Sequence, residues 1–310
     1  MKYVTPHFFK DFKCKGGSCR HNCCIGWEID IDSETLELYR STESSLRRRF
    51  ENCISSDDEP HFILDKNERC PFLNEDNLCD IILEMGEGSL CQICSDHPRF
   101  RNFLSSRTEE GVGLCCEEAC RLLLENKSAL TFDEYGQDGE CDEDEKYLLS
   151  LRRELFSILQ NRSLPLGARI NMMLEICGTD MPKKSITQWA HEYMKLERLD
   201  EQWTKALDSI CTDIDTSHFD DEYGDIEYQY EHFICYWLFR HFIDSAYDYG
   251  IEAAVRLSVL SYNIIHAVDA AYFNSNGMFP TEQRAEHIRM YSAEIEYCAE
   301  NLEALHSLLL

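Results

Sequence analysis

Basic residues are scarce in this sequence relative to acidic ones. The 310 residues contain 30 Lys and Arg against 58 Asp and Glu, which gives a formal net charge of −28. Proteins that bind nucleic acids or anionic membranes use Lys and Arg to neutralise phosphate groups. We therefore expect no nucleic-acid partner and no membrane partner, whereas a partner that presents lysines would suit this charge.

Long apolar runs are also absent. The longest candidate, Phe233–Phe239, is followed by Arg240, and it is far shorter than the roughly 20 residues of a transmembrane helix. The first residues, Met1 to His7, contain no apolar segment of the kind found in secretory signal peptides. We expect a cytoplasmic protein, in which thiols stay reduced.

Glycine is infrequent, with 14 residues, and no glycine-rich loop is followed by an acidic residue about 20 positions later. A Rossmann-type cofactor domain is therefore not expected. The sequence also lacks a P-loop, a His-Glu-x-x-His motif and a Ser/His/Asp triad pattern. A hydrophobic content of 44% nevertheless excludes a wholly disordered chain.

Cysteine, by contrast, is abundant and unevenly placed. Twelve of the 17 cysteines lie in the first 120 residues: Cys14, Cys19, Cys23, Cys24, Cys53, Cys70, Cys79, Cys91, Cys94, Cys115, Cys116 and Cys120. In a reducing compartment such a concentration predicts metal binding or redox chemistry. The five cysteines further along are typical of buried free thiols, which pack as small hydrophobic groups.

The pattern predicts a mainly α fold in two parts. Residues 1–130 form an irregular, cysteine-rich, metal-stapled domain with a helix near 33–53, for which Asp32 supplies a start. Residues 131–145 hold eight acidic side chains and no Lys or Arg, which is typical of a linker. Residues 146–310 form an all-α domain with apolar residues at helical spacing, near 146–159, 166–177, 185–211, 226–248, 251–272 and 281–309.

Four thiols fall within eleven positions in the order Cys14-x4-Cys19-x3-Cys23-Cys24, and Gly16-Gly17 permits a tight turn between them. Thiolates bind Zn²⁺, iron–sulfur clusters and Cu(I), and sulfur coordination alone does not separate these metals. Cys91-Gln92-Ile93-Cys94 has the spacing of a redox dithiol, although no βαβ pattern surrounds it.

The N-terminal motifs resemble those of the FliB-type flagellin lysine-N-methylase family and, more distantly, of small cysteine-cluster proteins described as zinc- or iron-chelating domains. The residues that carry the resemblance are the Cys14/Cys19/Cys23/Cys24 cluster with Gly26-Trp27, Cys70-Pro71-Phe72-Leu73, Leu78-Cys79 and Cys94-x2-His97-Pro98-Arg99. These motifs cover residues 1–125, whereas the helical remainder is similar only in general character.

The resemblance implies S-adenosylmethionine-dependent methyl transfer to lysines of flagellin, with a cysteine-bound [4Fe–4S] cluster. Carried over by position, the metal ligands are Cys14, Cys19, Cys23, Cys24, Cys70, Cys79, Cys94 and Cys116. Eight ligands would make two four-coordinate sites, or one cluster with spare thiols. Cys53, Cys91, Cys115 and Cys120 fall outside this pattern. Zinc is the alternative metal.

Two further residues are candidates for cofactor binding. Trp27 would stack on the adenine or sulfonium of the methyl donor, and Arg99 would bind its carboxylate. The alternatives are a core aromatic for Trp27 and a structural ion pair for Arg99. The sequence indicates no catalytic acid or base, and we interpret Asp32 as a helix start rather than as a catalytic group.

A second acidic segment, 213–231, contains interleaved aromatic residues. It is either a solvated loop that leads into a helix or a docking face for a lysine-rich partner. The competing function for the whole chain is a non-catalytic, zinc-stapled adaptor. A disulfide-stapled secreted protein is a third interpretation, which the missing export signal and the odd cysteine count oppose.

Overall fold

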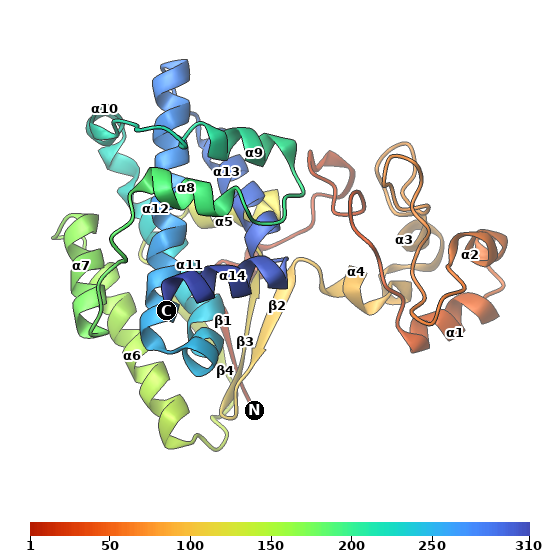
Figure 1. The fold of residues 1–310 in the computed structure, drawn as a ribbon. Helices are drawn as coiled ribbons and strands as arrows, with labels where there is room; N and C mark the ends of the chain where they lie inside the picture. The colour runs from red at the N-terminus through yellow and green to blue at the C-terminus, as the bar shows by residue number, and fades with distance from the viewer. The chain divides into compact units, whose positions relative to one another are not determined.

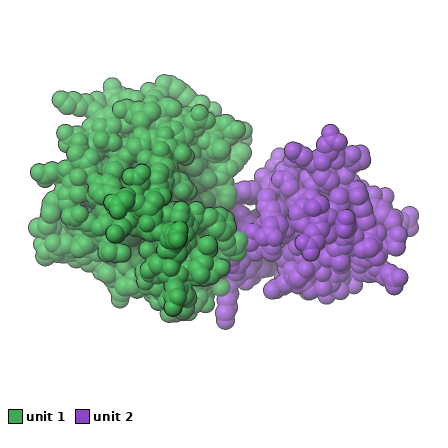
Figure 2. All heavy atoms as spheres, turned by 90° about the horizontal axis from the view of Figure 1, so that it is seen from below, with its two compact units in different colours: residues 1–12, 101–115, 119–310 green, residues 13–100, 116–118 purple.

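The structure, a computed structural model, describes residues 1–310. It contains fourteen α-helices and one four-stranded sheet, so the prediction of a mainly α fold is confirmed (Figure 1). None of its helices is both long and apolar enough to cross a bilayer. The chain divides into two compact units, which Figure 2 shows in different colours. Unit 1 comprises residues 1–12, 101–115 and 119–310, and unit 2 comprises residues 13–100 and 116–118.

Unit 1 is built around two long helices, α11 (Glu227–Tyr249) and α12 (Ile251–Asn276), which pack against each other (Figure 1). Both bury side chains around their whole circumference, as a helix in the centre of a core must. The apolar run Phe233–Phe239 is thus a core helix segment. The surrounding helices are α5 (Glu117–Glu125), α6 (Glu143–Leu159), α7 (Leu166–Ile176), α8 (Ile186–Tyr193), α9 (Glu201–Asp208), α10 (Ser217–Glu222), α13 (Thr281–Ile295) and α14 (Ala299–Leu309).

A small sheet joins the first residues of the chain to this helical unit. Its strands are β1 (Lys2–Pro6), β2 (Arg99–Phe103), β3 (Arg107–Val112) and β4 (Phe132–Tyr135), in the order β2-β3-β1-β4. β1 runs parallel to β3, with Val4 opposite Glu109, and antiparallel to β4, with Val4 opposite Glu134. The sheet and the helices therefore belong to the same unit, because later strands of the chain pair with β1.

This arrangement corrects the expected acidic linker at 131–145. The segment contains β4, and Asp142 caps α6 by accepting a hydrogen bond from the Glu145 backbone N–H at 2.7 Å. The Phe132 ring stacks at 5.2 Å from Phe156 and 4.8 Å from Phe239, measured between centroids. One half-buried aromatic side chain and a cap thus fix a segment whose acidic composition suggests solvation.

Unit 2 contains four short helices: α1 (Ser33–Ser41), α2 (Arg47–Cys53), α3 (Asp80–Met85) and α4 (Gln92–Asp96). The expected single helix at 33–53 is wrong, since it is divided into α1 and α2. Between them the Thr42 and Ser44 hydroxyls accept hydrogen bonds from the backbone N–H groups of Ser44 and Leu46, at 3.2 and 3.3 Å. Such local side-chain bonds compete with the helical backbone bonds.

Two of the later expected helices are also divided. The range 185–211 holds α8, which begins with a capping box at Ser185 and Gln188, and α9, which Asp200 caps. The range 281–309 holds α13 and α14. Capping residues within a stretch of apolar residues at helical spacing therefore mark helix boundaries that the spacing alone does not show.

The acidic segment 213–231 leads into α11 through the short helix α10. Two of its aromatic residues face the core, since Phe219 is 1% exposed and Tyr230 is 4% exposed, and Tyr223 and Tyr228 are half-buried. Six of its carboxylates are exposed: Asp213, Asp215, Asp220, Asp221, Glu222 and Asp225. The buried aromatics supply no docking area, so the structure favours the solvated segment over an aromatic docking face.

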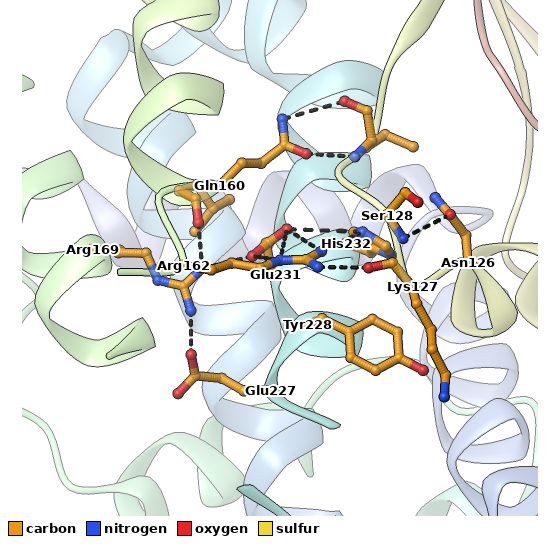
Figure 3. A network of polar contacts seen from close by, with 12 residues as sticks. Asn126, Lys127, Ser128, Gln160, Arg162, Arg169, Glu227, Tyr228, Glu231 and His232 are labelled. Carbon is orange, nitrogen blue, oxygen red and sulfur yellow. Dashed lines mark hydrogen bonds and ion pairs between the residues drawn. The ribbon is translucent and has the colours of Figure 1, made fainter. Parts of the chain in front are cut away.

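Buried charges on α11 hold unit 1 together. Glu231 is fully buried and binds two arginines, with its carboxylate 2.8 Å from Arg162 Nη2 and 2.6 Å from Arg169 Nη1 (Figure 3). Arg162 also donates to the Lys127 carbonyl at 2.6 Å. The adjacent His232 bonds the Leu123 carbonyl through Nδ1 at 3.2 Å. Because burying an unpaired carboxylate is costly, these contacts fix the 123–128 loop against α11.

A second buried network, on the same helix, surrounds the Glu296 carboxylate. Its Oε2 lies 2.7 Å from the Tyr236 hydroxyl, 3.0 Å from Arg240 Nη1 and 2.8 Å from His241 Nε2. The Arg240 guanidinium also lies over the Tyr297 ring, 4.8 Å from its centroid. Gly113, just after β3, lies against this network, because a Cβ built there would be 2.0 Å from the Tyr297 hydroxyl and 2.9 Å from Arg240 Nη1.

We expect Gly113→Ala to destabilise the protein by about 1–3 kcal/mol, the usual cost of adding atoms to a packed interior. The new methyl group must displace side chains that the Glu296 network holds. Gly167→Ala, in α7, is the matched control, since a Cβ there meets nothing within 4 Å. It should be neutral or stabilising by up to about 1 kcal/mol. Urea unfolding measures both, and equal losses would contradict the assignment of Gly113 to a close contact.

Candidate metal centre

The cysteines of unit 2 are positioned by its small aromatic core. The rings of Tyr39 and Phe50 stack with centroids 4.1 Å apart, and Phe72 lies 4.7 Å from Phe50. Cys70 and Cys91 belong to this buried core. Cys24, Cys79 and Cys94, together with Cys53, are partly buried and pack against it.

Backbone hydrogen bonds bring together the segments that carry Cys24, Cys70 and Cys79. The Cys70 N–H donates to the Cys24 carbonyl at 2.8 Å. The Leu73 N–H then donates to the Cys70 carbonyl at 3.0 Å, which closes the Cys-Pro-Phe-Leu turn. An antiparallel bridge pairs Leu73 with Cys79. The spacing between Cys70 and Cys79 therefore corresponds to a turn, which brings the chain at Cys79 back toward Cys70.

Cys91 and Cys94 form a thiol pair, with their Sγ atoms 3.3 Å apart at the start of α4. Asp32 fixes this start, because its carboxylate accepts the Gln92 N–H at 2.8 Å and the Thr35 N–H at 2.9 Å. These two backbone bonds lower the pKa of Asp32. The interpretation of Asp32 as a helix start is thus confirmed, and it caps α4 as well as α1.

Five cysteines of unit 2 are here called the thiol group, because the pKa of each is shifted by at least one other member: Cys24, Cys70, Cys79, Cys91 and Cys94. Burial raises the pKa of Cys70 to about 11, and neighbouring Cys79 and Cys91 add to the effect. The hydrogen bond with Cys91, followed by burial, raises the pKa of Cys94. Sequence reasoning left Cys91 outside the ligand set, and its only signal was the C-x2-C spacing to Cys94.

Three more predicted ligands form a second set around Cys19: Cys19 itself, Cys23 and Cys116. Burial raises the pKa of the Cys19 thiol to about 11, with further contributions from Glu117, Cys116 and Cys23. Glu117 itself pairs with Lys15 at 3.1 Å. The thiols of Cys23 and Cys24 are hydrogen-bonded, which lowers the pKa of Cys23 to about 7. This pair links the second set of thiols to the thiol group.

The remaining predicted ligand, Cys14, is exposed, and its sulfur accepts a hydrogen bond from the Gly16 N–H at 3.4 Å. The structure thus places four of the eight predicted ligands in the thiol group and three around Cys19.

The two predicted cofactor-binding residues both lie beside α4, the helix that carries Cys94. The half-buried Trp27 ring meets His97, which follows α4, edge-on with centroids 5.1 Å apart. Arg99 donates from Nη1 to the Ser95 carbonyl at 3.3 Å. Neither contact defines a cofactor site, so their roles in cofactor binding remain predictions.

The chemistry of the thiol group fits a sulfur-ligated metal centre. It supplies five sulfur donors, and soft thiolate donors are those that Zn²⁺ and iron–sulfur clusters take. The raised pKa values of Cys24, Cys70, Cys79 and Cys94 mean that these thiols are protonated at neutral pH without metal. Metal binding would therefore release protons and strengthen as the pH rises.

The sequence did not indicate the buried acid–base pair that lies in unit 1. His287 Nδ1 lies 2.6 Å from the Asp269 carboxylate, whose other oxygen accepts the Tyr230 hydroxyl at 2.7 Å. Asp269 is fully buried and His287 is 2% exposed. The two residues are 18 positions apart, so no local motif indicates the pair. Since a protein substrate has no access to it, the pair serves to join α11, α12 and α13.

Comparison with known proteins bears on the helical part of the chain. Residues 183–310 match the family model described as the FliB lysine N-methylase C-terminal domain. The chain is also similar to proteins named Lysine-N-methylase from Salmonella choleraesuis and Salmonella typhimurium, each 29% identical over 151 residues. These matches confirm the resemblance to the FliB-type family, and they extend it to the region that was similar only in general character.

Each of these two alignments covers 43% of this chain and 36% of the relative, so the matched part is about a third of either Lysine-N-methylase. A protein named Flagellar biosynthetic protein FliU, from Salmonella muenchen, is 28% identical over 150 residues, or 43% of this chain and 85% of that protein. No solved structure matches the chain.

Replacing Cys91 should remove bound metal, whereas replacing Cys53 should not. Both thiols contact the same core, but only Cys91 lies in the thiol group, so Cys53→Ala controls for lost packing. We expect Cys91→Ala to lower the iron plus zinc bound per chain, measured by mass spectrometry after anaerobic purification. Loss of a ligand should also remove metal-coupled folding energy. Equal metal content in the two variants would refute the assignment of Cys91.

Proposed function

We propose that the protein is a protein-lysine N-methyltransferase that uses S-adenosylmethionine and acts on flagellin. The observation that carries this proposal is the match of residues 183–310 to the FliB lysine N-methylase C-terminal domain, together with the cysteine motifs that precede it. Relatives are named Lysine-N-methylase, which supports lysine methylation in general. The proposal goes beyond the names of the relatives in three respects: the methyl donor, the protein substrate and the metal centre.

The proposed reaction moves one methyl group from the sulfonium sulfur of the donor to the amine nitrogen of a lysine. A bond forms between the lysine Nζ and the methyl carbon while the bond from that carbon to the sulfonium sulfur breaks. S-Adenosylhomocysteine leaves, and the amine loses one proton to a base or to water. The lysine amine must be neutral to attack, so the enzyme has to lower its pKa by desolvation or place a proton acceptor beside it.

The thiol group is the proposed holder of an iron–sulfur cluster. Cys24, Cys70, Cys79, Cys91 and Cys94 supply its sulfur donors, and the aromatic core of Tyr39, Phe50 and Phe72 fixes their backbone. When bound, such a cluster would offer an iron atom to the amino and carboxylate groups of the methyl donor, or it would staple unit 2. Trp27, which lies beside α4, is the proposed contact for the donor's adenine or sulfonium, and Arg99, also beside α4, is the proposed contact for its carboxylate.

Flagellin is the proposed substrate because one relative carries the name Flagellar biosynthetic protein FliU. The excess of carboxylates, with a net charge of −28, favours the approach of a lysine-bearing surface. All 17 cysteines are free, which suits a reducing compartment, and we therefore infer a cytoplasmic location.

The direct test uses protein purified without air, methyl-labelled S-adenosylmethionine and flagellin from the same organism. We expect label to enter lysine side chains, identified by mass spectrometry of the digested flagellin. Flagellin whose lysine amines have been acetylated is the matched control and should take up no label, because an amide nitrogen is not nucleophilic.

Failure both to methylate flagellin and to bind S-adenosylmethionine would contradict the proposal. If that protein instead carried stoichiometric zinc without acid-labile sulfide, the zinc-stapled adaptor would be the better account. Methylation of other lysine-bearing proteins with no preference for flagellin would retain the reaction but remove the proposed partner.

A further inference from the structure

An open hollow beside α6, in unit 1, has no role in the proposed methyl transfer. Its volume is about 480 Å³, within the usual range for sites that bind small molecules. It is lined by Arg107 from β3, by Cys141 and by the α6 residues Glu143, Lys146, Tyr147, Leu149, Ser150 and Arg153. Most of these α6 residues recur at intervals of three or four, so one face of the helix forms the wall.

The wall of this hollow is positively charged in a protein of net charge −28. Arg107, Lys146 and Arg153 face a single lining carboxylate, that of Glu143. Lys146 and Arg153 make no ion pair or side-chain hydrogen bond. Arg107 donates from Nε to the Ser106 hydroxyl at 3.3 Å and lies 3.4 Å from Asp138, a carboxylate that Lys2 also contacts at 3.3 Å.

Another arginine of α6 does form an ion pair. Arg152, one residue before Arg153, is 5% exposed and forms a bidentate ion pair with the buried Glu109. Arg153 lies on another face and lines the hollow without a partner. Three cations around one concavity repel one another, and a bound anion would relieve that repulsion.

We propose that this hollow is a binding site for a small phosphate-bearing anion of the nucleotide type. The guanidinium groups of Arg107 and Arg153 match phosphate oxygens in geometry, and Lys146 adds a third positive charge. The Ser150 hydroxyl supplies a neutral donor. Tyr147 is 59% exposed, so its ring offers a surface on which a base can stack.

The test is a calorimetric titration of the full chain with ADP, pyrophosphate and adenosine. We expect saturable binding of ADP and pyrophosphate and much weaker binding of adenosine, which carries the ring but no phosphate. Lys146→Gln/Arg153→Gln should weaken ADP binding at least about tenfold, because two charge-assisted contacts are lost. Both side chains are exposed, so the double variant should fold, which circular dichroism checks.

Lys183→Gln/Lys205→Gln is the matched control, since it removes two positive charges from exposed positions of unit 1 that do not line the hollow. It should bind ADP nearly as the unsubstituted protein does. Equal weakening in the two double variants would show that only the net charge matters, and would overturn the site. Absence of saturable binding at millimolar ADP and pyrophosphate, or equal binding of adenosine, would overturn it as well.

Discussion

The structure of unit 1 depends on the burial of charged side chains along α11. Glu231 and Arg240 lie on this helix, and each is paired with groups from distant parts of the sequence: Arg162 and Arg169 for the first, Glu296 for the second. A buried charge without its partner costs several kcal/mol. The core can therefore form only when the segment 123–128, the loop after α6, helix α7 and the end of α13 are all in place. This requirement joins residues from 123 to 296 into one unit.

Unit 2 depends on a different constraint. Its helices are short, and its core groups four aromatic rings with aliphatic side chains and with the five cysteines of the thiol group. A core of this size gains little stability from apolar burial alone, and small domains often add metals for that reason. In our account the thiol group serves both purposes, since the centre that would staple the domain would also meet the methyl donor.

Individual residues show which features of the structure could be predicted from the sequence. The apolar period of Leu148, Leu151 and Leu155 predicted α6, and Asp32 predicted the start of α1, because both signals are local. Phe132 contradicted the acidic linker, since its burial depends on Phe239, more than a hundred residues away. Cys91 was separated from its neighbours by a family pattern, although its contact with Cys94 is local. The Asp269–His287 pair has no sequence signal, because tertiary packing alone brings its residues together. The cationic hollow lies on one face of α6, but tertiary packing adds Arg107 from β3 to it.

The central claim is that the thiol group of unit 2 holds an iron–sulfur centre. Iron and acid-labile sulfide, quantified per chain in protein isolated without exposure to air, test it most directly. The account predicts iron and sulfide in equal amounts, about four of each for a [4Fe–4S] cluster, and visible absorption from sulfur-to-iron charge transfer. Colourless protein with stoichiometric zinc and no labile sulfide would contradict it.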